Sequence, residues 1–189
     1  MGDSPESIPS RLSRGEAADV LILDGGAADE LGKRGLVRAD SKVELALSLI
    51  GMVMREDSAK PDIGTVAALK DTLLAATSIA YSDSGSGTHL STKLFAQLGV
   101  AYTIASKSRK VRGPPSSEPV AAVVARGEAE IGFQQVPELI HTPGITFVGP
   151  LPAKVQPIFS LAGVLTHAVQ QPEAAAPCCG FSLPQRRQR

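Results

Sequence analysis

The chain contains one phrase twice, as RGEAADVLIL at residues 14–23 and as RGEAEIGFQQ at residues 126–135, and this repeat decides the fold. Each copy reads as a helix end, a glycine, an acidic step and a short apolar strand, and a glycine past the last helical turn favours a left-handed C-cap. Small or polar residues follow each strand, where ligands bind in open α/β sheets. Two copies of one helix–strand unit predict two similar lobes that share a cleft, unless two ordinary joints match by chance.

Composition and charge exclude several classes of function. A chain of 189 residues can bury the core of one large domain or two small ones. Its 19 basic and 19 acidic residues balance, and its aromatic residues are scarce, so nucleic-acid binding is not expected. No apolar run reaches the roughly 18 residues that span a bilayer, and residues 1–6 are too polar and acidic for a signal peptide. We therefore expect no membrane insertion.

Strand and helix signals alternate along the chain and predict an α/β architecture. The expected strands are residues 20–23, 43–54, 78–81, 131–134, 146–148 and 156–164. The expected helices are residues 7–14, 27–33, 66–76, 89–98, 120–125 and 137–141. Residues 106–119 are basic and rich in proline and serine, which predicts a surface loop.

The segment SDSGSGTH (residues 82–89) connects an expected strand to an expected helix and carries the clearest binding signal. Its glycines permit unusual backbone angles, and the helix start adds free backbone N–H groups. Hydroxyl donors come from Ser82, Ser84, Ser86 and Thr88. We expect the segment to bind a carboxylate or a small oxyanion, and the alternative is a plain turn that caps the helix. It lacks the residues of a Walker motif and of a dinucleotide fingerprint.

The remaining reactive residues are sparse. His89, His141 and His167 are far apart and share no metal-ligand spacing, so we expect surface or capping roles, no metal and no cofactor. No nucleophile elbow or recognisable triad is present, and no catalytic residue is predicted. The basic run at residues 109–112 is most simply a solvated loop, and it also offers positive charge to an anionic ligand.

The chain resembles the molybdate-type extracellular solute-binding proteins in segments that read, in order, GEAADVLIL, SLIGMVMRED, KPDIGTVAALKDTLL, SIAYSDSGSGTH, ARGEAEIGFQQVPELI and VGPLPAKVQ. The resemblance covers about residues 4–175. It implies a two-lobed type II periplasmic-binding-protein-like fold, with an oxyanion held in the cleft by hydroxyls and backbone N–H groups. It also implies a small anionic ligand, an ABC transporter permease as partner and a periplasmic location, although the chain shows no signal peptide.

Carried over by position, the resemblance divides the chain into lobe 1 (residues 1–54), lobe 2 (residues 55–150) and a return segment to lobe 1 (residues 151–176). It places Ser4 or Ser7 at the helix start of lobe 1. Together with the hydroxyl segment, it gives this expected ligand-binding set: Ser4, Ser7, Ser82, Ser84, Ser86, Gly87, Thr88 and Gln134.

The chain departs from the family pattern in three places. The opening strand and helix of the family, with its export signal and a binding hydroxyl, have no counterpart before Met1, so we expect an incomplete first lobe. Ile158 and Phe159 stand where a tyrosine is expected, which weakens the case for a metal oxyanion. Residues 177–189 replace the closing helices, and a one-base frameshift near Ala176 would account for this tail. We expect the tail, Cys178 and Cys179 included, to carry no function.

A second class of function comes from the same neighbourhood. The sequence SPESIPSRL…SRGEAADVLIL also resembles a branch of the family that includes aconitate isomerases, which move a double bond in a small tricarboxylate. That reaction needs a base beside a carboxylate and donors that hold the carboxylates. His89 and Asp24 are the plausible bases in the sequence. Two hypotheses therefore stay open, a solute-binding protein of an ABC-type transporter and an aconitate isomerase-like enzyme.

Overall fold

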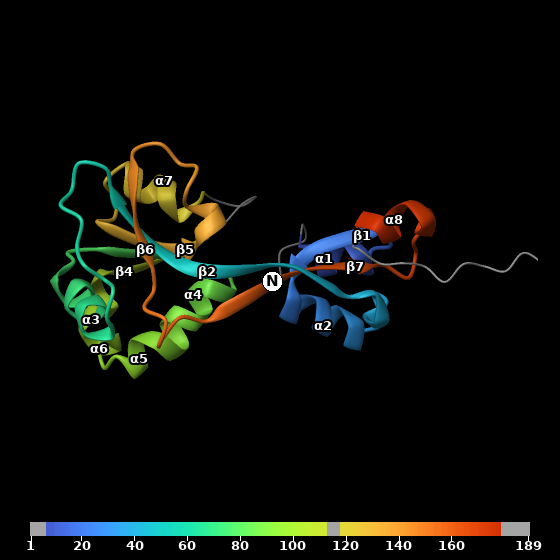
Figure 1. The fold of residues 1–189 in the computed structure, drawn as a ribbon, viewed down its shortest axis with the longest axis horizontal. Helices are drawn as coiled ribbons and strands as arrows, with labels where there is room; N and C mark the ends of the chain where they lie inside the picture. The colour runs from blue at the N-terminus through green and yellow to red at the C-terminus, as the bar shows by residue number, and fades with distance from the viewer. Residues whose placement is uncertain (1–6, 113–117, 179–189) are drawn as a thin grey trace, which may run out of the picture. The chain divides into compact units, whose positions relative to one another are not determined.

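The computed structural model describes residues 7–112 and 118–178, and the chain divides into two compact units (Figure 1). Unit 1 comprises Met1–Leu47 with Phe159–Arg189, and unit 2 comprises Ser48–Ile158. Both units combine strands with helices, which confirms the predicted α/β class. Every helix in the part of the chain that the structure describes falls short of the length and apolarity needed to cross a bilayer.

The boundaries of the two units fall inside strands. The sequence places the lobe boundaries after residues 54 and 150, whereas the packing divides the chain within β2 (Val43–Arg55) and at the start of β7 (Ile158–Leu165). Burial changes along β2, because its first half is largely exposed and its second half is almost wholly buried. One continuous strand therefore serves both units, and a strand signal alone does not mark where one unit ends.

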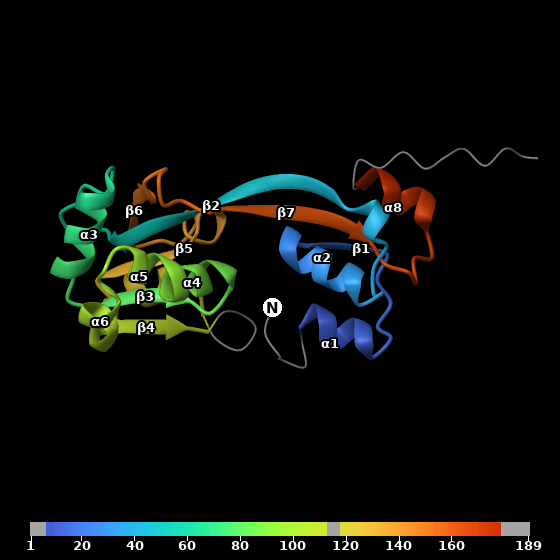
Figure 2. The ribbon, with the colours of Figure 1, turned by 90° about the horizontal axis from the view of Figure 1, so that it is seen from below.

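Unit 1 is built on a pair of antiparallel strands, β1 (Val20–Asp24) and β7, in which Leu21 faces Val164 and Leu23 faces Ala162. These apolar side chains form a core with helix α2 (Gly25–Lys33), which lies along β1 in Figure 2. Two further elements belong to this part of the chain, helix α1 (Ile8–Ser13) and the short 3-10 helix η1 (Ala39–Ser41). The buried residues of this core are Leu21, Leu23, Ala28, Leu31, Val37, Ala162 and Val164.

Helix α8 (Pro172–Cys178) follows β7. Asp19 precedes β1, and its carboxylate accepts hydrogen bonds from the backbone N–H groups of Gln170 at 2.8 Å and Gln171 at 3.2 Å, which fixes the start of α8. Most of the predicted aberrant tail lies outside the described residues, which end at Cys178. The expectations about that tail therefore stay predictions.

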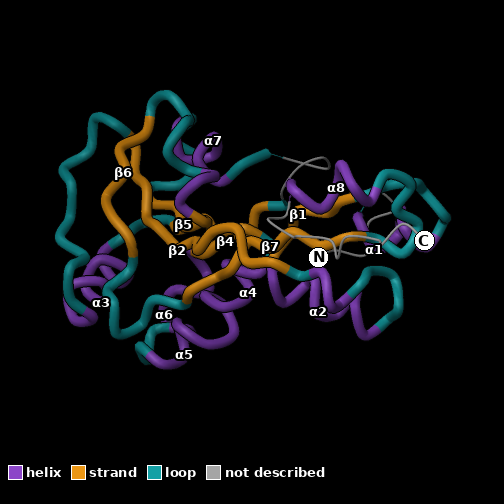
Figure 3. The backbone as a smooth tube through the Cα atoms, turned by 45° about the vertical axis from the view of Figure 1, so that its right-hand side comes forward, coloured by secondary structure: helices purple, strands orange, loops and turns teal. Residues whose placement is uncertain are grey.

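Unit 2 contains a mixed sheet, whose strands are orange in Figure 3. Its central strand β5 (Ile131–Gln135) lies antiparallel to β2 and parallel to β3 (Ile79–Ser82). Strand β4 (Ser108–Val111) adds to β3 in parallel, and β6 (Ile145–Pro150) pairs with β2. The parallel strands β3, β4 and β5 therefore end at one edge of the sheet.

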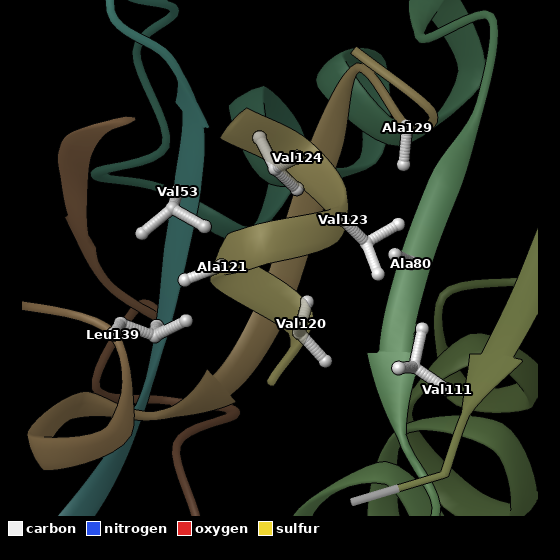
Figure 4. Close-up of a cluster of buried hydrophobic side chains, with 9 residues drawn as sticks. All are labelled: Val53, Ala80, Val111, Val120, Ala121, Val123, Val124, Ala129 and Leu139. Carbon is white, nitrogen blue, oxygen red and sulfur yellow. The ribbon is translucent and has the colours of Figure 1, made fainter. Parts of the chain in front are cut away.

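Helix α7 (Val120–Ala125) covers one face of this sheet (Figure 4). Gly132 on β5 permits the close approach, since a Cβ atom there would lie 2.7 Å from both Val120 Cγ1 and Val124 Cγ2. Side chains from β2, β3, β4 and the turn after β5 complete an apolar cluster around the helix. Its buried members are Val53, Ala80, Val111, Val120, Ala121, Val123, Val124, Ala129 and Leu139.

The remaining helices of unit 2 are short and partly continuous. Helix α3 (Val66–Ala75) begins where predicted, because the Thr65 hydroxyl accepts a hydrogen bond from the Ala68 N–H at 3.1 Å. A single helical run then comprises α4 (Gly85–His89), the π-helical turn η2 (Leu90–Leu94) and α5 (Phe95–Gln97). The short elements after it are α6 (Ala101–Ile104) and the 3-10 helices η3 (Ala105–Lys107) and η4 (Val136–Glu138).

Three local predictions were wrong. The expected loop at residues 106–119 contains the strand β4, which carries exposed basic residues and therefore lacks an apolar alternation. The helix expected from residue 89 begins at Gly85, because the serine- and glycine-rich segment is itself helical. The helix expected at residues 137–141 is only the short 3-10 turn η4, which follows β5 without a gap.

Candidate functional site

Three serine hydroxyls predicted to bind an anion converge at the end of β3. Ser82 Oγ lies 2.7 Å from Ser84 Oγ and 3.0 Å from Ser86 Oγ, and Ser84 Oγ lies 3.1 Å from Ser86 Oγ. The Ser82 and Ser86 residues are buried, whereas Ser84 is only partly covered. Each hydroxyl has one donor and two acceptor sites and can rotate its proton to suit a partner. The hydroxyl cluster of Ser82, Ser84 and Ser86 can therefore turn donors toward an incoming oxygen anion.

Backbone packing holds these hydroxyls together. A Cβ atom at Gly87 would lie 1.6 Å from the carbonyl oxygen of Ser82, so only glycine lets the first turn of α4 rest against the end of β3. Ser84 is the extended N-cap residue of α4, and its side chain makes no capping bond to the backbone. The N–H of Thr88 bonds to the carbonyl of Ser84 at 2.9 Å, so the N–H groups of residues 85–87 lie in the first turn of the helical run, where helices have no intrahelical partner for them.

A π-helical turn follows this helix start. Within it, Ser91 Oγ donates to the carbonyl of Gly87 at 2.8 Å, and Thr92 Oγ1 donates to the carbonyl of Thr88 at 2.7 Å. Turns of this kind occur often at functional sites. Here each hydroxyl bonds to the carbonyl four residues before it, a pattern that slightly destabilises helices and often bends them.

Gln134 lies beside this cluster on the neighbouring strand. The parallel register joins Ala80 to Gly132 and Tyr81 to Phe133, and the next step places Ser82 beside Gln134 on the same face. Gln134 is 2% exposed, and its Oε1 accepts a hydrogen bond from the Val120 N–H at 3.1 Å. The strand register thus places the predicted glutamine near the end of β5, beside the end of β3 that carries Ser82, and the buried amide has a partner within the protein.

Glu138 is an acidic neighbour that the sequence reasoning did not identify. The Nε2 group of Gln134 donates a short hydrogen bond to Oε2 of Glu138, which ends the turn η4. Partial burial of its carboxyl raises the pKa of Glu138 above the ordinary value, and the bond from Gln134 opposes this effect. An acidic residue three positions after the polar strand end at Gln135 was the available signal in the sequence.

The other predicted residues lie elsewhere. Ser7 precedes α1 in unit 1, where its hydroxyl donates to Ser10 Oγ at 3.0 Å, and Ser4 lies outside the described residues. Thr88 is exposed in the first turn of α4. Asp24, one of the expected bases, caps α2 by accepting a hydrogen bond from the Ala27 N–H at 3.1 Å.

His89, the other expected base, is partly covered in the same helical run. Its burial lowers the pKa of His89, and the positive charge of Lys93 adds to this effect. Among the residues that the structure describes, no group of at least three His, Cys, Asp or Glu side chains could hold a metal ion.

Unit 2 also contains a cavity of about 850 Å³ that does not include the hydroxyl cluster. Residues 60–64 and 148–153 line it, mostly with apolar groups. Its cation, Lys60, already donates to the carbonyl of Phe147 at 3.3 Å, and Asp62 accepts from the Gly64 N–H at 2.7 Å. No hydroxyl side chain is among the described residues that line this cavity, so the hydroxyl cluster is a better candidate for an anion site built from neutral donors.

Comparisons with known proteins agree with this architecture. An aconitate isomerase from a Pseudomonas species is 46% identical over 175 residues, which are 93% of this chain and 65% of that protein. The chain therefore spans less than two thirds of that relative. The Azotobacter vinelandii periplasmic molybdate-binding protein is similar with a TM-score of 0.59 at 18% identity, covering 93% of this chain and 83% of the other.

A spermidine/putrescine transporter substrate-binding protein from Streptococcus pneumoniae has a TM-score of 0.61 at 12% identity and covers 92% of this chain and 65% of the other. At such identities these likenesses show the fold, which is that of type II periplasmic binding proteins. A family model described as bacterial extracellular solute-binding protein matches residues 1–177. This chain therefore belongs to the bacterial extracellular solute-binding protein family.

Proposed function

We propose that the protein is the solute-binding component of an ABC-type transporter, and that the hydroxyl cluster of unit 2 holds the anionic group of a small solute. The convergence of three hydroxyls within 2.7–3.1 Å of one another, at a helix start, carries this proposal. The family places such proteins outside the cytoplasm, which supports a periplasmic role with a permease as partner.

The chemistry of the cluster favours a carboxylate or a small oxyanion. Neutral hydroxyls and N–H groups form charge-assisted hydrogen bonds with an anion, which are stronger than neutral ones. Positive charge is nearby, because β4 pairs Val111 with Ser82 and the exposed Arg112 directly follows. Arg112 therefore supplies attraction over a longer range while the hydroxyls set the geometry.

Isothermal titration with molybdate, sulfate and trans-aconitate tests the proposal. Ser86→Ala removes a buried donor and should weaken binding of the accepted anion by about 1–3 kcal/mol. Ser108→Ala is the matched control, because the Ser108 hydroxyl is buried in β4 without a hydrogen-bond partner among the described residues. An absence of heat with all three anions would remove the proposed function, and equal binding by the Ser86→Ala variant would remove the site.

An aconitate isomerase-like activity is the second candidate. One observation favours it, the 46% identity to an aconitate isomerase over 93% of this chain. Proton NMR of trans-aconitate with the protein distinguishes the candidates. Conversion to the cis isomer supports an enzyme, whereas saturable binding without conversion supports a carrier.

A further inference from the structure

Glu138 follows strand β5 of unit 2. Its carboxylate accepts a hydrogen bond from Gln134, a residue near the end of β5. Ser82 and Gln134 continue the register of two parallel strands, whose spacing is about 4.8 Å. Their side chains share the face that α7 covers, since Ala80 and Gly132 pack against that helix. The amide of Gln134 then reaches Glu138.

The amide of Gln134 has only one orientation that satisfies its neighbours. Its Oε1 must face the N–H of Val120, which leaves Nε2 to face the carboxylate of Glu138. This bond engages Oε2 of Glu138 and leaves the lone pairs of Oε1 for another partner. The Glu138 carboxyl group is therefore held on one side by Gln134, and the residue as a whole is exposed.

We propose that Glu138 is the base that moves the proton in the isomerisation of trans-aconitate, while the hydroxyl cluster holds the carboxylate next to the reacting carbon. This inference rests on the second candidate function. Partial burial favours the protonated form of this group, so it accepts a proton more readily than an ordinary carboxylate. The pairing of a carboxylate base with hydroxyl donors is the arrangement that proton abstraction beside a carboxylate requires.

The proposed step balances without any further reagent. Glu138 Oε1 takes one proton from the methylene carbon of trans-aconitate, and the electron pair left behind spreads over the allylic carbons and the adjacent carboxylate. The hydroxyl cluster stabilises the negative charge on that carboxylate. The proton then returns from Glu138 to the former vinyl carbon, so the double bond has moved and its geometry can reset to cis. Nothing is oxidised or reduced.

Proton exchange in heavy water tests the inference on the full chain. Trans-aconitate in D₂O should lose its methylene proton signal in the presence of the protein and gain signals of the cis isomer. Glu138→Gln keeps an oxygen acceptor for the Gln134 amide but cannot take a proton, and it should slow exchange by at least about 100-fold. Titration calorimetry should show that this variant still binds trans-aconitate. Glu56→Gln is the matched control, because this exposed glutamate follows β2 at the opposite edge of the sheet.

The outcomes separate this inference from the proposed function. Binding of trans-aconitate by the unaltered protein without exchange would overturn the inference and leave the carrier standing. The inference would also be overturned if the Glu138→Gln variant exchanged protons at the unaltered rate. It would be overturned as well if exchange were lost in His89→Gln but kept in Glu138→Gln. Absence of binding by the unaltered protein would overturn both. If Glu138→Gln fails to fold, Glu138→Asp replaces it, and it should retain measurable exchange at a reduced rate; an unchanged rate would contradict the inference.

Discussion

The two copies of the repeated phrase share one local structure. Gly15 follows α1 with φ of 78°, and Gly127 follows α7 with φ of 75°. In the first copy the N–H of Gly15 bonds to the carbonyl of Leu12 at 2.9 Å, and in the second the N–H of Gly127 bonds to that of Val124 at 2.9 Å. The following glutamate N–H closes the same 3.1 Å bond in both copies, as in a Schellman C-cap.

The strands that follow differ at their matched positions. Ile22 on β1 is 57% exposed, whereas the equivalent Gln134 on β5 is 2% exposed. Strand β5 lies between β2 and β3 and under α7, so its polar side chain is enclosed and finds partners there. The face of β1 that carries Ile22 is turned away from the core that α2 covers. Local residues thus determine the turn, and tertiary neighbours determine burial.

The largest expected effect contrasts the apolar residues before these positions. Phe133→Ala should destabilise unit 2 by about 3–5 kcal/mol, because Phe133 is 1% exposed and its removal leaves a cavity. The matched Leu21→Ala should cost unit 1 about 2 kcal/mol, at the lower end for such changes, because the opposite face of β1 is open. Hydrogen exchange measured separately for each unit checks both values. Equal costs would show that the two strands are equally enclosed.

A second experiment exchanges polarity at the matched positions themselves. Gln134→Leu leaves the Val120 N–H without its acceptor and should cost about 1–3 kcal/mol. Ile22→Gln places a polar group on an exposed position and should change stability by less than about 0.5 kcal/mol. Denaturant unfolding, monitored by hydrogen exchange, measures the stability change of each variant. A stabilised Gln134→Leu variant would show that the amide is not needed in the sheet.

Signals carried by a few adjacent residues predicted the fold well. The glycine stops, the Thr65 cap and the apolar strands need no distant partner to be recognised, and the structure has them where expected. The hydroxyl segment was also predicted, since its serines and glycines lie within one short stretch.

Features that depend on distant neighbours were missed. Strand β4 reads as a basic loop because an edge strand with exposed side chains needs no apolar pattern. Glu138 is bonded to Gln134, and only the pairing of β5 with β3 brings the ends of these two strands, which carry Gln134 and Ser82, side by side. The division of β2 between two units was also invisible, because its burial changes without any break in the strand signal.

The C-cap that both copies share predicts that replacing its glycine costs the same stability in each copy. Gly15→Ala and Gly127→Ala each force a side chain into the left-handed region and should cost about 1–2 kcal/mol in their own units. A Cβ atom meets nothing within 4 Å at Gly15, and at Gly127 it meets only the flexible end of Arg55 at 3.2 Å. Thermal unfolding with hydrogen exchange compares them. A cost at Gly127 far above that at Gly15 would mean that packing, not backbone angle, requires glycine there.

The smallest expected effect concerns the glutamates that follow the two glycines. Hydrogen bonding to Arg11 lowers the pKa of Glu16, and hydrogen bonding to Arg126, then to Arg109, lowers the pKa of Glu128. A lowered pKa in the folded state stabilises the protein above the unfolded value of about 4.3, and this contribution is lost as pH falls through the folded value. Both glutamates are exposed and screened by salt, so the stabilisation is small.

The two ion pairs should nevertheless respond differently to loss of the arginine that contributes most. Arg11→Gln should raise the pKa of Glu16 most of the way to its ordinary value, because only the weaker attraction of the Arg14 charge then lowers it. Arg126→Gln should raise the pKa of Glu128 less completely, because Arg109 Nη1 still lies 3.0 Å from Glu128 Oε2 and keeps its hydrogen bond. Carboxyl ¹³C NMR titrations from pH 2 to 7 at low salt measure both values. A pKa of Glu128 that returns fully to its ordinary value in the Arg126→Gln variant would show that Arg109 does not stabilise the charged carboxylate. In that case one arginine would account for the lowered pKa of Glu128.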